Sequence, residues 1–336
     1  MKPKTLTARR IRLEKTRKWR WGTNRWFILA FAILTAIGVK IAAPVQSVIQ
    51  VAPETLSKTP IFTLPVIGSV YLTNTVVAMV LMDLAILGVA LIVKLNVKPG
   101  ALIAKGFSGM MEMLIEVLYN LTQSTAGKWA KKIFPWFATI FIIVLFANLL
   151  KLIPGYESIG LVEEVKSGGY TAIPMGGNWF NVTTPAVAEG GSVVIPFARG
   201  LSTDLNFTAA LALISVLMTQ VIGVQAQGLG YFNKFFDTRT LFKKPFFGFM
   251  DLIVSILETI SEFSKIISFT FRLFGNMFAG MVLMILVGVM VPVFFPSLIM
   301  MFELFIGAIQ AFVFGMLTLV FMAMATSGHA EEHAAS

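Results

Sequence analysis

Long apolar runs, separated by short polar segments, dominate the pattern of this chain. A helix that crosses a hydrocarbon core of about 30 Å needs about 20 apolar residues. Runs that reach or approach this length lie at 26–43, 74–93, 134–153 and 205–224, and two longer ones lie at 245–292 and 296–325. The pattern predicts an all-α integral membrane protein with about six hydrophobic helices.

The segment 101–123 has a different pattern. Its polar residues recur at helical spacing and share one face, with Met113, Leu114 and Val117 among the apolar residues on the other side. These polar residues are Glu112, Glu116, Asn120 and Gln123. A helix with one polar and one apolar face is suited to lie along the membrane interface, so we expect one interfacial helix besides the six.

The run that follows Pro245 contains no proline before Pro292. An unbroken helix of this length would measure about 69 Å, so it must break, extend into water or tilt strongly. Its polar residues fall on one narrow stripe at 100° per residue. They are Asp251, Ser255, Glu258, Glu262, Lys265, Arg272 and Asn276. We expect a tilted helix whose polar stripe faces protein or water.

The last run completes a hairpin with this helix. Glu303 and Gln310 are seven residues apart and share a face, and Gly307 between them lets a neighbouring backbone come close. The sequence therefore predicts two long, strongly tilted final helices with polar groups aimed inward. Because ionisable residues are costly inside a membrane, their default interpretation is functional.

Charged residues divide the loops into two classes. Basic residues precede the first run and follow the second, and they also lie near 128–132 and 234–244, whereas the Gly- and Pro-rich loop 154–200 carries four glutamates. Basic loops stay in the cytoplasm. Both termini are therefore predicted to be cytoplasmic, and loop 154–200 is predicted to be external, with a composition that allows short strands.

Composition excludes several classes of protein. Charged residues make up 13% of the chain and hydrophobic residues 57%, whereas a soluble domain has about 25% charged residues. The net charge of +10 arises largely from a basic block before the first apolar run, which favours lipid headgroups over nucleic acid. There is no Cys, and both histidines lie in the polar tail, so neither a metal site nor a cofactor site is predicted.

Three parts follow from these patterns. Residues 1–70 hold the basic N-terminus, the span 26–43 and an external segment; residues 71–328 form the membrane domain; residues 329–336 form a polar tail. A cleaved signal peptide is the alternative for the first apolar run, since Ala42 and Ala43 are small. Both alternatives place residues from Pro44 onward outside the cytoplasm.

Four segments resemble the F-type ATP synthase subunit a family. The segment 268–277, SFTFRLFGNM, resembles the signature S-x-x-x-R-L-F-G-N-M of that family. The segment 146–155, FANLLKLIPG, is similar to F-A-N-L-L-G-L-I-P-G, and 203–208, TDLNFT, to a D-x-N-x-T helix start. The segment 302–312, FELFIGAIQAF, is similar to the last-helix pattern ending in Q-A-F. The resemblance covers residues 74–325.

This resemblance implies a non-catalytic stator subunit in the Fo sector of a bacterial inner-membrane ATP synthase. Such a subunit forms two ion half-channels and carries protons to and from carboxylates of the rotating c-ring. Arg272 matches the essential arginine between the channels. Because its guanidinium does not deprotonate in proteins, it cannot carry a proton; it favours ionised ring carboxylates and blocks leakage instead. Implied partners are the c-ring, subunit b, the remaining Fo and F1 subunits and membrane lipids. Nucleotide chemistry falls to those other subunits, since no G-x-x-x-x-G-K-[ST] loop occurs.

The resemblance also implies roles for individual residues of the proton path. Gln310 lies opposite Arg272 and helps to hold it, and Ser268 opens the arginine signature. Asn276 and Glu303 match half-channel positions. The remaining matches are Glu258 on the cytoplasmic side and Asp204 and Asn206 near the external opening.

The chain departs from the family pattern at Met281, where many relatives have an acid or a histidine. The external relay would then rest on Glu303 with water or Asp204. Asp83 inside the second run has no place in the path, and we expect it to pack against a polar partner. The ion itself, H⁺ or Na⁺, is not fixed by this chain, because the ring carboxylate lies on another one; H⁺ is expected.

Two other functional classes fit less well. A secondary transporter often shows repeated halves with broken helices at matching positions, and no such repeat is visible. An intramembrane hydrolase needs a metal motif or a nucleophile with a base, and the predicted spans hold no histidine. Neither class accounts for Arg272, Asn276 and Gln310 together.

Overall fold

The computed structural model describes most of the chain from residue 52 to residue 327. The described ranges are 52–57, 59–65, 68–97, 105–153, 155–166, 169–186, 190–235, 245–290 and 295–327. The predicted first span lies outside them except for five helical positions, and so do the basic N-terminus and the tail 329–336. These five positions are Trp26, Leu29, Ala30, Ile33 and Ile37.

Five stretches of the described chain are long and apolar enough to cross a membrane. The helices involved are α3 (Asn74–Asn96), α4 (Phe107–Ala126) with α5 (Ala130–Leu150), α6 (Leu205–Gln227), α7 (Pro245–Met290) and α8 (Phe295–Thr326). The prediction of an all-α membrane protein is confirmed, with boundaries that differ by a few residues. The helix of α5 begins four residues before the predicted start and runs through Pro135.

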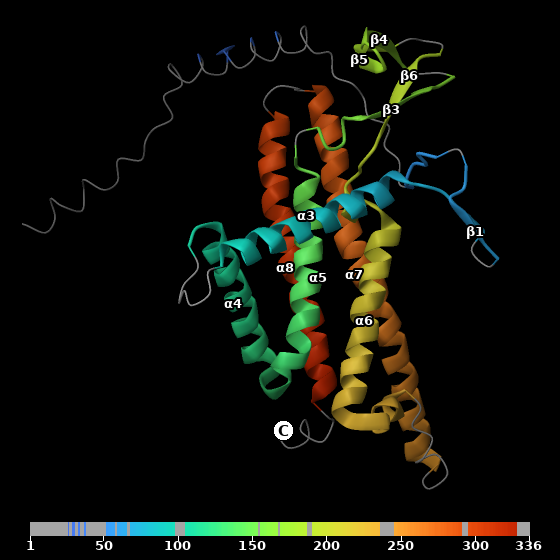
Figure 1. Ribbon diagram of the computed structural model, residues 1–336. Coiled ribbons are helices and arrows are strands. Elements are labelled where there is room, and N and C mark those ends of the chain that lie inside the picture. Colours follow the sequence, from blue (N-terminus) through green and yellow to red (C-terminus); the bar gives the residue numbers. More distant parts are fainter. Residues whose placement is uncertain are drawn as a thin grey trace, which may run out of the picture.

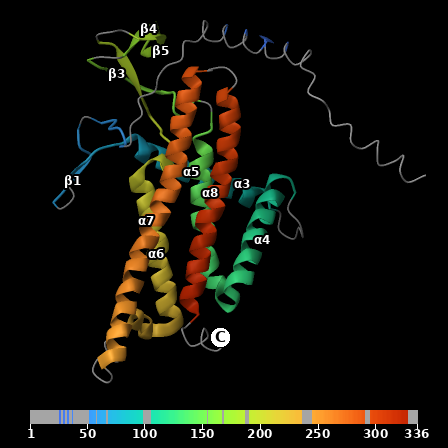
Figure 2. The same cartoon turned by 180° about the vertical axis from the view of Figure 1, so that it is seen from behind.

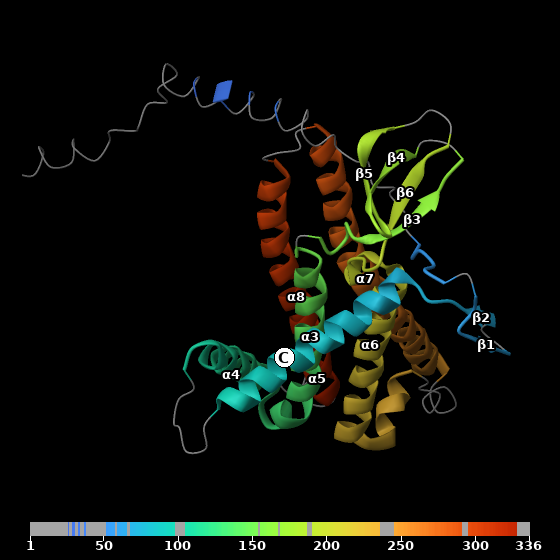
Figure 3. The ribbon, with the colours of Figure 1, turned by 45° about the horizontal axis from the view of Figure 1, so that its top comes forward.

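The helix α7 is unbroken over 46 residues, as the absence of proline predicts. Its apolar stretch Leu252–Gly288 holds 37 residues, which corresponds to about 56 Å of helix. A hydrocarbon core of about 30 Å accommodates this stretch only if α7 is strongly tilted. The 23-residue helix α3 has the length of a single upright crossing, and it runs across the α5–α8 bundle (Figures 1 and 3).

The helices α4 and α5 form a hairpin through the short 3₁₀ helix η1 (Gly127–Trp129). Gly127, which follows α4, has a φ of 51°, a left-handed conformation that glycine adopts without strain. The polar residues of α4 face outward, because Glu112, Glu116 and Asn120 are all exposed while Leu118 is buried. The interfacial position of α4 remains a prediction.

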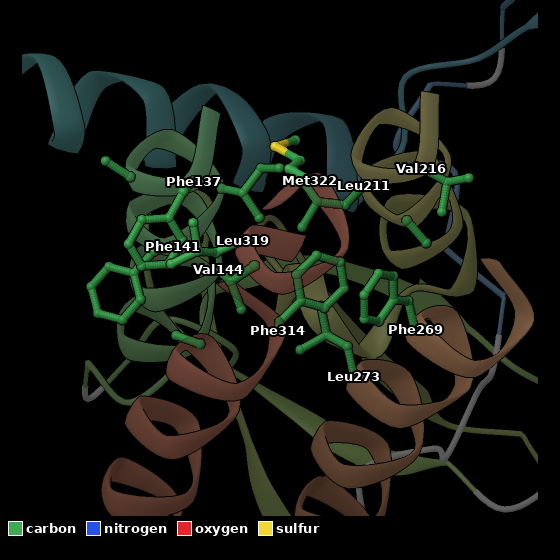
Figure 4. Packing of buried hydrophobic residues seen from close by; sticks show 14 of the residues in the cluster. Phe137, Phe141, Val144, Leu211, Val216, Phe269, Leu273, Phe314, Leu319 and Met322 are labelled. Carbon is green, nitrogen blue, oxygen red and sulfur yellow. The ribbon is translucent and has the colours of Figure 1, made fainter. Parts of the chain in front are cut away.

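The hydrophobic core lies between α5, α6, α7 and α8. Phe137 and Val144 of α5, Phe269 of α7 and Phe314 of α8 are at most 2% exposed, and their side chains meet in the centre of the bundle (Figure 4). The rings of Phe269 and Phe314 lie 4.9 Å apart. Seen from behind, α7 and α8 form one surface of the bundle in front of α5 and α6 (Figure 2). The core thus supports the inner side of the predicted hairpin.

A small sheet follows α5 in the segment predicted to be an external loop. Its strands are β3 (Gly160–Glu164), β4 (Tyr170–Gly176), β5 (Trp179–Ala186) and β6 (Ser192–Pro196), in the order β3-β6-β4-β5 with antiparallel pairing. A separate hairpin joins β1 (Phe62–Leu64) to β2 (Gly68–Val70) before α3. The short strands anticipated in loop 154–200 are therefore present.

The chain returns to the bundle through η2 (Leu201–Thr203), a 3₁₀ helix whose three residues are all buried. Asp204 then caps α6, because its Oδ1 accepts a hydrogen bond from the Asn206 backbone N at 2.9 Å. A third 3₁₀ helix, η3 (Gly228–Lys234), follows α6.

Gly307 is a point of close approach between α5 and α8. A Cβ placed there would lie 3.0 Å from the Asn148 Cβ, and the Asn148 Nδ2 donates to the Gly307 carbonyl at 3.0 Å. Asn148 Oδ1 also accepts a hydrogen bond from Ser202 Oγ at 2.6 Å. One buried amide thus joins α5, α8 and η2.

Gly307→Val should lower the midpoint of thermal unfolding of the detergent-solubilised protein. The branched side chain would separate α5 from α8 and weaken the Asn148 hydrogen bond, at a cost of about 1–3 kcal/mol. Gly88→Val on α3 is the matched control, because nothing lies within 4 Å of a Cβ there. Both variants share the change in helix propensity; apart from this change, Gly88→Val should alter the free energy of unfolding by no more than about 0.5 kcal/mol. Equal midpoints for the two variants would contradict the close contact.

Candidate functional site

A side-chain hydrogen bond connects the two helices of the hairpin at the C-terminal end of the polar stripe. The Asn276 Nδ2 of α7 donates to the Gln310 Oε1 of α8 at 2.8 Å. Gln310 is 4% exposed, and its Nε2 has no hydrogen-bond partner among the described residues. Two residues predicted to belong to one site are thus in direct contact.

Arg272 lies one turn before Asn276 and is partly exposed. Its Nη2 donates to Ser268 Oγ at 3.3 Å, and its guanidinium carbon lies 5.9 Å from the centre of the Phe269 ring. Within the described ranges, no carboxylate forms an ion pair with Arg272 and no hydrogen bond joins it to Gln310. Ser268 and Phe269, both on α7, are therefore the neighbours that orient the guanidinium.

Glu303 forms a buried ion pair with a lysine that follows α5. The Lys151 Nζ lies 3.3 Å from Glu303 Oε2, and the two side chains are 4% and 5% exposed. The contact is an ion pair without hydrogen-bond geometry, because both carboxylate oxygens lack a hydrogen-bond partner in the described structure. The carboxylate therefore retains oxygens that can accept a proton or a hydrogen bond.

The ion pair borders a cavity of about 230 Å³. Its polar lining consists of Lys151, Glu303 and Asn276, and Gly280 also lines it. A Cβ at Gly280 would lie 2.5 Å from Glu303 Oε1, so only a glycine leaves the carboxylate in its place. The cavity is large enough for several water molecules, and it extends from the Glu303 carboxylate to the Asn276 amide.

Glu157 follows α5 in the loop predicted to be external and lies near the same ion pair. Its Oε1 accepts a hydrogen bond from the Gly200 backbone N at 2.8 Å. Burial raises the pKa of the Glu157 carboxyl above its ordinary value, and the nearby Glu303 charge adds to this. The Gly200 hydrogen bond and the positive charges of Lys151 and Arg199 act in the opposite direction.

Asp204 and Asn206 do not reach the Glu303 carboxylate through any recorded contact. Asp204 is 4% exposed and serves as the cap of α6, and Asn206 is exposed. A connection between their helix start and the hairpin runs through Ser202, Asn148 and Gly307. The structure brings these two residues to the neighbourhood of the site and not into contact with it.

The polar stripe continues on the other side of Arg272. Glu262 accepts hydrogen bonds from Lys265 Nζ at 2.9 Å and from Gln220 Nε2 of α6 at 3.0 Å. Gln220 in turn accepts one from the Tyr231 hydroxyl at 2.9 Å. Burial and the charges of Glu262 and Glu258 raise the Tyr231 pKa, so this hydroxyl stays a donor. Glu258 is half-buried one turn further along α7.

Sequence reasoning missed the parts of the site supplied by Lys151 and Glu157. The signal for Lys151 was present, since this lysine replaces a glycine of the F-A-N-L-L-G-L-I-P-G pattern.

Met281, the position at which the chain departs from the family pattern, is 8% exposed. Asp83 is exposed on α3, and the described residues offer it no hydrogen bond or ion pair, so the polar partner predicted for it is not found among them.

Known proteins resemble this chain over most of its length. The family model described as ATP synthase A chain matches residues 75–323. The ATP synthase subunit a of Moorella thermoacetica is 28% identical over 228 residues, which are 68% of this chain and 80% of the relative. ATP synthase subunit a 1 of Syntrophotalea carbinolica is 29% identical over 245 residues, 72% of this chain and 81% of the relative. The subunit a of a Sulfurihydrogenibium species is 28% identical and covers 70% of this chain and 88% of the relative.

The matched region contains the whole of α4 to α7, all of α3 except Asn74, and all of α8 except its last three residues. It therefore contains Arg272, Asn276, Gln310 and the Lys151–Glu303 pair. A multi-pass membrane bundle with these residues, matched by the family model over most of its length, belongs to the ATP synthase A chain family and is a subunit a of an F-type ATP synthase.

Proposed function

We propose that this subunit forms the two ion half-channels of the Fo motor and carries protons to and from the c-ring carboxylates. Proton flow across the membrane would thereby be coupled to rotation and ATP synthesis. The observation that carries the proposal is the environment of Arg272, which is a permanent positive charge on a membrane helix with no carboxylate partner in the described chain. Its counter-charge then comes from another chain.

The cost of a charge in the membrane supports this argument. An unpaired arginine at the centre of a bilayer costs at least about 2.5–3.5 kcal/mol. Ser268 and the Phe269 ring only partly offset such a cost, because neither carries a negative charge. A carboxylate that passes in front of Arg272 would be favoured in its ionised form and would neutralise the guanidinium.

The surface around Arg272 is suited to a close helix partner. Ser268, Gly275, Asn276 and Ala279 lie on the same side of α7 as Arg272, and all four are exposed. Small residues allow two helices in a membrane to approach closely. Only 17% of the apolar window of α7 is buried within the chain, against 44% for α6. We infer that the c-ring covers this face.

Arg272 also separates two polar regions. Gly280, which contacts Glu303, is about 12 Å further along α7, and Glu258 is about 21 Å away in the other direction. The Glu303 cavity would belong to the external half-channel and Glu258 to the cytoplasmic one. A proton leak between them would dissipate about 2.3 kcal/mol per charge at 100 mV, and the fixed positive charge between the channels opposes this leak.

The rest of the proposal concerns the setting of the subunit. It is non-catalytic, and the nucleotide chemistry takes place on the F1 subunits. Its partners are the c-ring at the Arg272 face, subunit b and the remaining subunits of the complex, in a bacterial plasma membrane with both termini in the cytoplasm. The proposal also divides the chain into an N-terminal part with an additional span up to residue 70, a membrane domain up to residue 328, and a polar tail.

Arg272→Ala should abolish ATP synthesis driven by a proton gradient in vesicles that hold the assembled complex. Loss of the fixed charge removes both the attraction for ring carboxylates and the barrier between the half-channels. Lys94→Ala is the control, because it removes an exposed positive charge from the end of α3 and should leave synthesis unchanged. Synthesis at the wild-type rate in assembled Arg272→Ala complexes would contradict the proposed role.

Gly280→Ala should slow proton-driven ATP synthesis by about 10- to 100-fold, because a displaced functional group loses its productive geometry. The new methyl group would push the Glu303 carboxylate out of its place. Stability should change little, since the displaced atoms are the end of a flexible side chain. Gly88→Ala, with nothing within 4 Å of the added Cβ, provides the control for helix propensity. A normal rate in Gly280→Ala would show that the position of the Glu303 carboxylate is unimportant.

A further inference from the structure

The Lys151–Glu303 pair is the part of the site that the resemblance does not account for. The family pattern quoted above has a glycine at position 151, and this chain departs from the pattern again at Met281 on α7. Burying an ion pair costs several kcal/mol per ion in lost hydration, and packing alone could be achieved by apolar residues. A pair buried at the cavity despite this cost points to a role in the proton path.

The position of the pair beside the cavity favours proton exchange over a purely structural contact. Lys151 Nζ lies 3.3 Å from Glu303 Oε2 outside hydrogen-bond geometry, so a proton passes between them once the flexible lysine aligns or a water molecule of the cavity bridges the two groups. The cavity beside the pair leads toward Asn276, and thus toward the face that carries Arg272. A lysine ammonium has three donors on a flexible stem and can lose a proton when it is buried, unlike an arginine.

The Lys151–Glu303 pair also adjoins Glu157 in the loop that follows α5. A Cβ at Gly200 would lie 3.2 Å from Glu157 Oε1 and 3.2 Å from Lys151 Cδ, so the two side chains converge on the same glycine. Glu157 is only half-buried, and burial raises the pKa of its carboxyl, which favours uptake of a proton. The charged groups near Lys151 are therefore Glu303 from α8 and Glu157 from the loop, and the Arg199 charge acts on the same Glu157 carboxyl.

We propose that Lys151 relays protons between Glu157 and Glu303 in the external half-channel and makes this path selective for H⁺ over Na⁺. The inference rests on the proposed function of the subunit. The Lys151 ammonium gives one proton to the Glu303 carboxylate, which leaves an amine and a neutral carboxylic acid. The amine then takes a proton from the protonated Glu157, directly or through water, and Glu157 is reprotonated from the external medium. One proton enters and one moves on toward Asn276 and the ring, so charge and atoms balance.

Selectivity follows from the same contact. A sodium ion that enters the cavity needs oxygen ligands, and the Glu303 carboxylate is the anionic ligand there. The Lys151 ammonium already occupies the neighbourhood of this carboxylate and repels a second cation. A proton avoids this repulsion because it passes through the two groups themselves.

Lys151→Arg tests the relay, because arginine keeps the positive charge of the ion pair and cannot give up its proton. We expect the variant complex to assemble in membranes, while ATP-driven proton pumping falls by about 10²-fold. Lys151→Gln should show a similar loss. Normal pumping by Lys151→Arg across the pH range of the wild type would overturn the proposal and reduce Lys151 to a counter-ion. If Lys151→Arg does not assemble, Glu157→Gln decides in its place: slowed pumping with a changed pH profile supports the relay, and wild-type pumping overturns it.

Sodium dependence of the wild-type complex provides a test that needs no variant. Pumping should be unchanged by sodium salts at constant ionic strength, and sodium flux should be undetectable. Sodium-driven ATP synthesis by the wild type would overturn the selectivity. Arg272→Ala in the same vesicles distinguishes a failure of the proposed relay from a failure of the proposed function of the subunit. Pumping that persists without Arg272 refutes the function of the subunit, whereas pumping that needs Arg272 and is unaffected by loss of the Lys151 proton refutes only the relay.

Discussion

The positive charge of Arg272 in a low-dielectric layer is the constraint on which the other features depend. This charge cannot be removed by deprotonation, so it needs either a partner or access to water. The described chain supplies only a hydroxyl and an aromatic ring. The long helix α7 carries the arginine far from either end, and the packed core behind it holds its uncovered face in one orientation. We propose that an anionic partner on a neighbouring chain completes the arrangement.

The core explains how the hairpin keeps this orientation. Phe269, three residues before Arg272, packs against Phe314 and Phe321 of α8. The Asn276–Gln310 hydrogen bond joins the two helices one turn after Arg272. The buried Asn148 amide fixes α8 to α5 and η2. Apolar packing and a few buried polar contacts thus determine where the charge lies.

Much of this arrangement could be predicted from the sequence. The apolar runs indicated the membrane helices, and the absence of proline after Pro245 predicted that α7 continues unbroken. Helical spacing placed Glu303 and Gln310 on one face. These inferences depend on local periodicity, which a single sequence contains. The strand order in the segment between α5 and α6 and the Lys151–Glu303 contact could not be predicted, because they depend on how distant elements pack. Asn148 and Gly307, whose contact brings α5 to α8, are 159 residues apart.

The two halves of the site handle charge in different ways. On the side that we propose to be external, Lys151 and Glu157 accompany Glu303, and the cavity extends toward Asn276. On the other side, Glu262 is held by Lys265 and Gln220. Exchange of protons on both sides is compatible with the absence of leakage only if the charge between them stays fixed. An arginine meets this requirement, and a lysine or histidine in its place would not.

Disulfide cross-linking in the assembled complex tests most directly whether the Arg272 face meets the c-ring. The chain has no cysteine, so single substitutions can be introduced without a background reaction. Ala279→Cys, exposed seven residues after Arg272 on the same face, should cross-link to a cysteine placed beside the ring carboxylate. Ala90→Cys, exposed on α3, should not. A cross-link from position 90 with none from position 279 would contradict the account, because the ring would then lie against a different face.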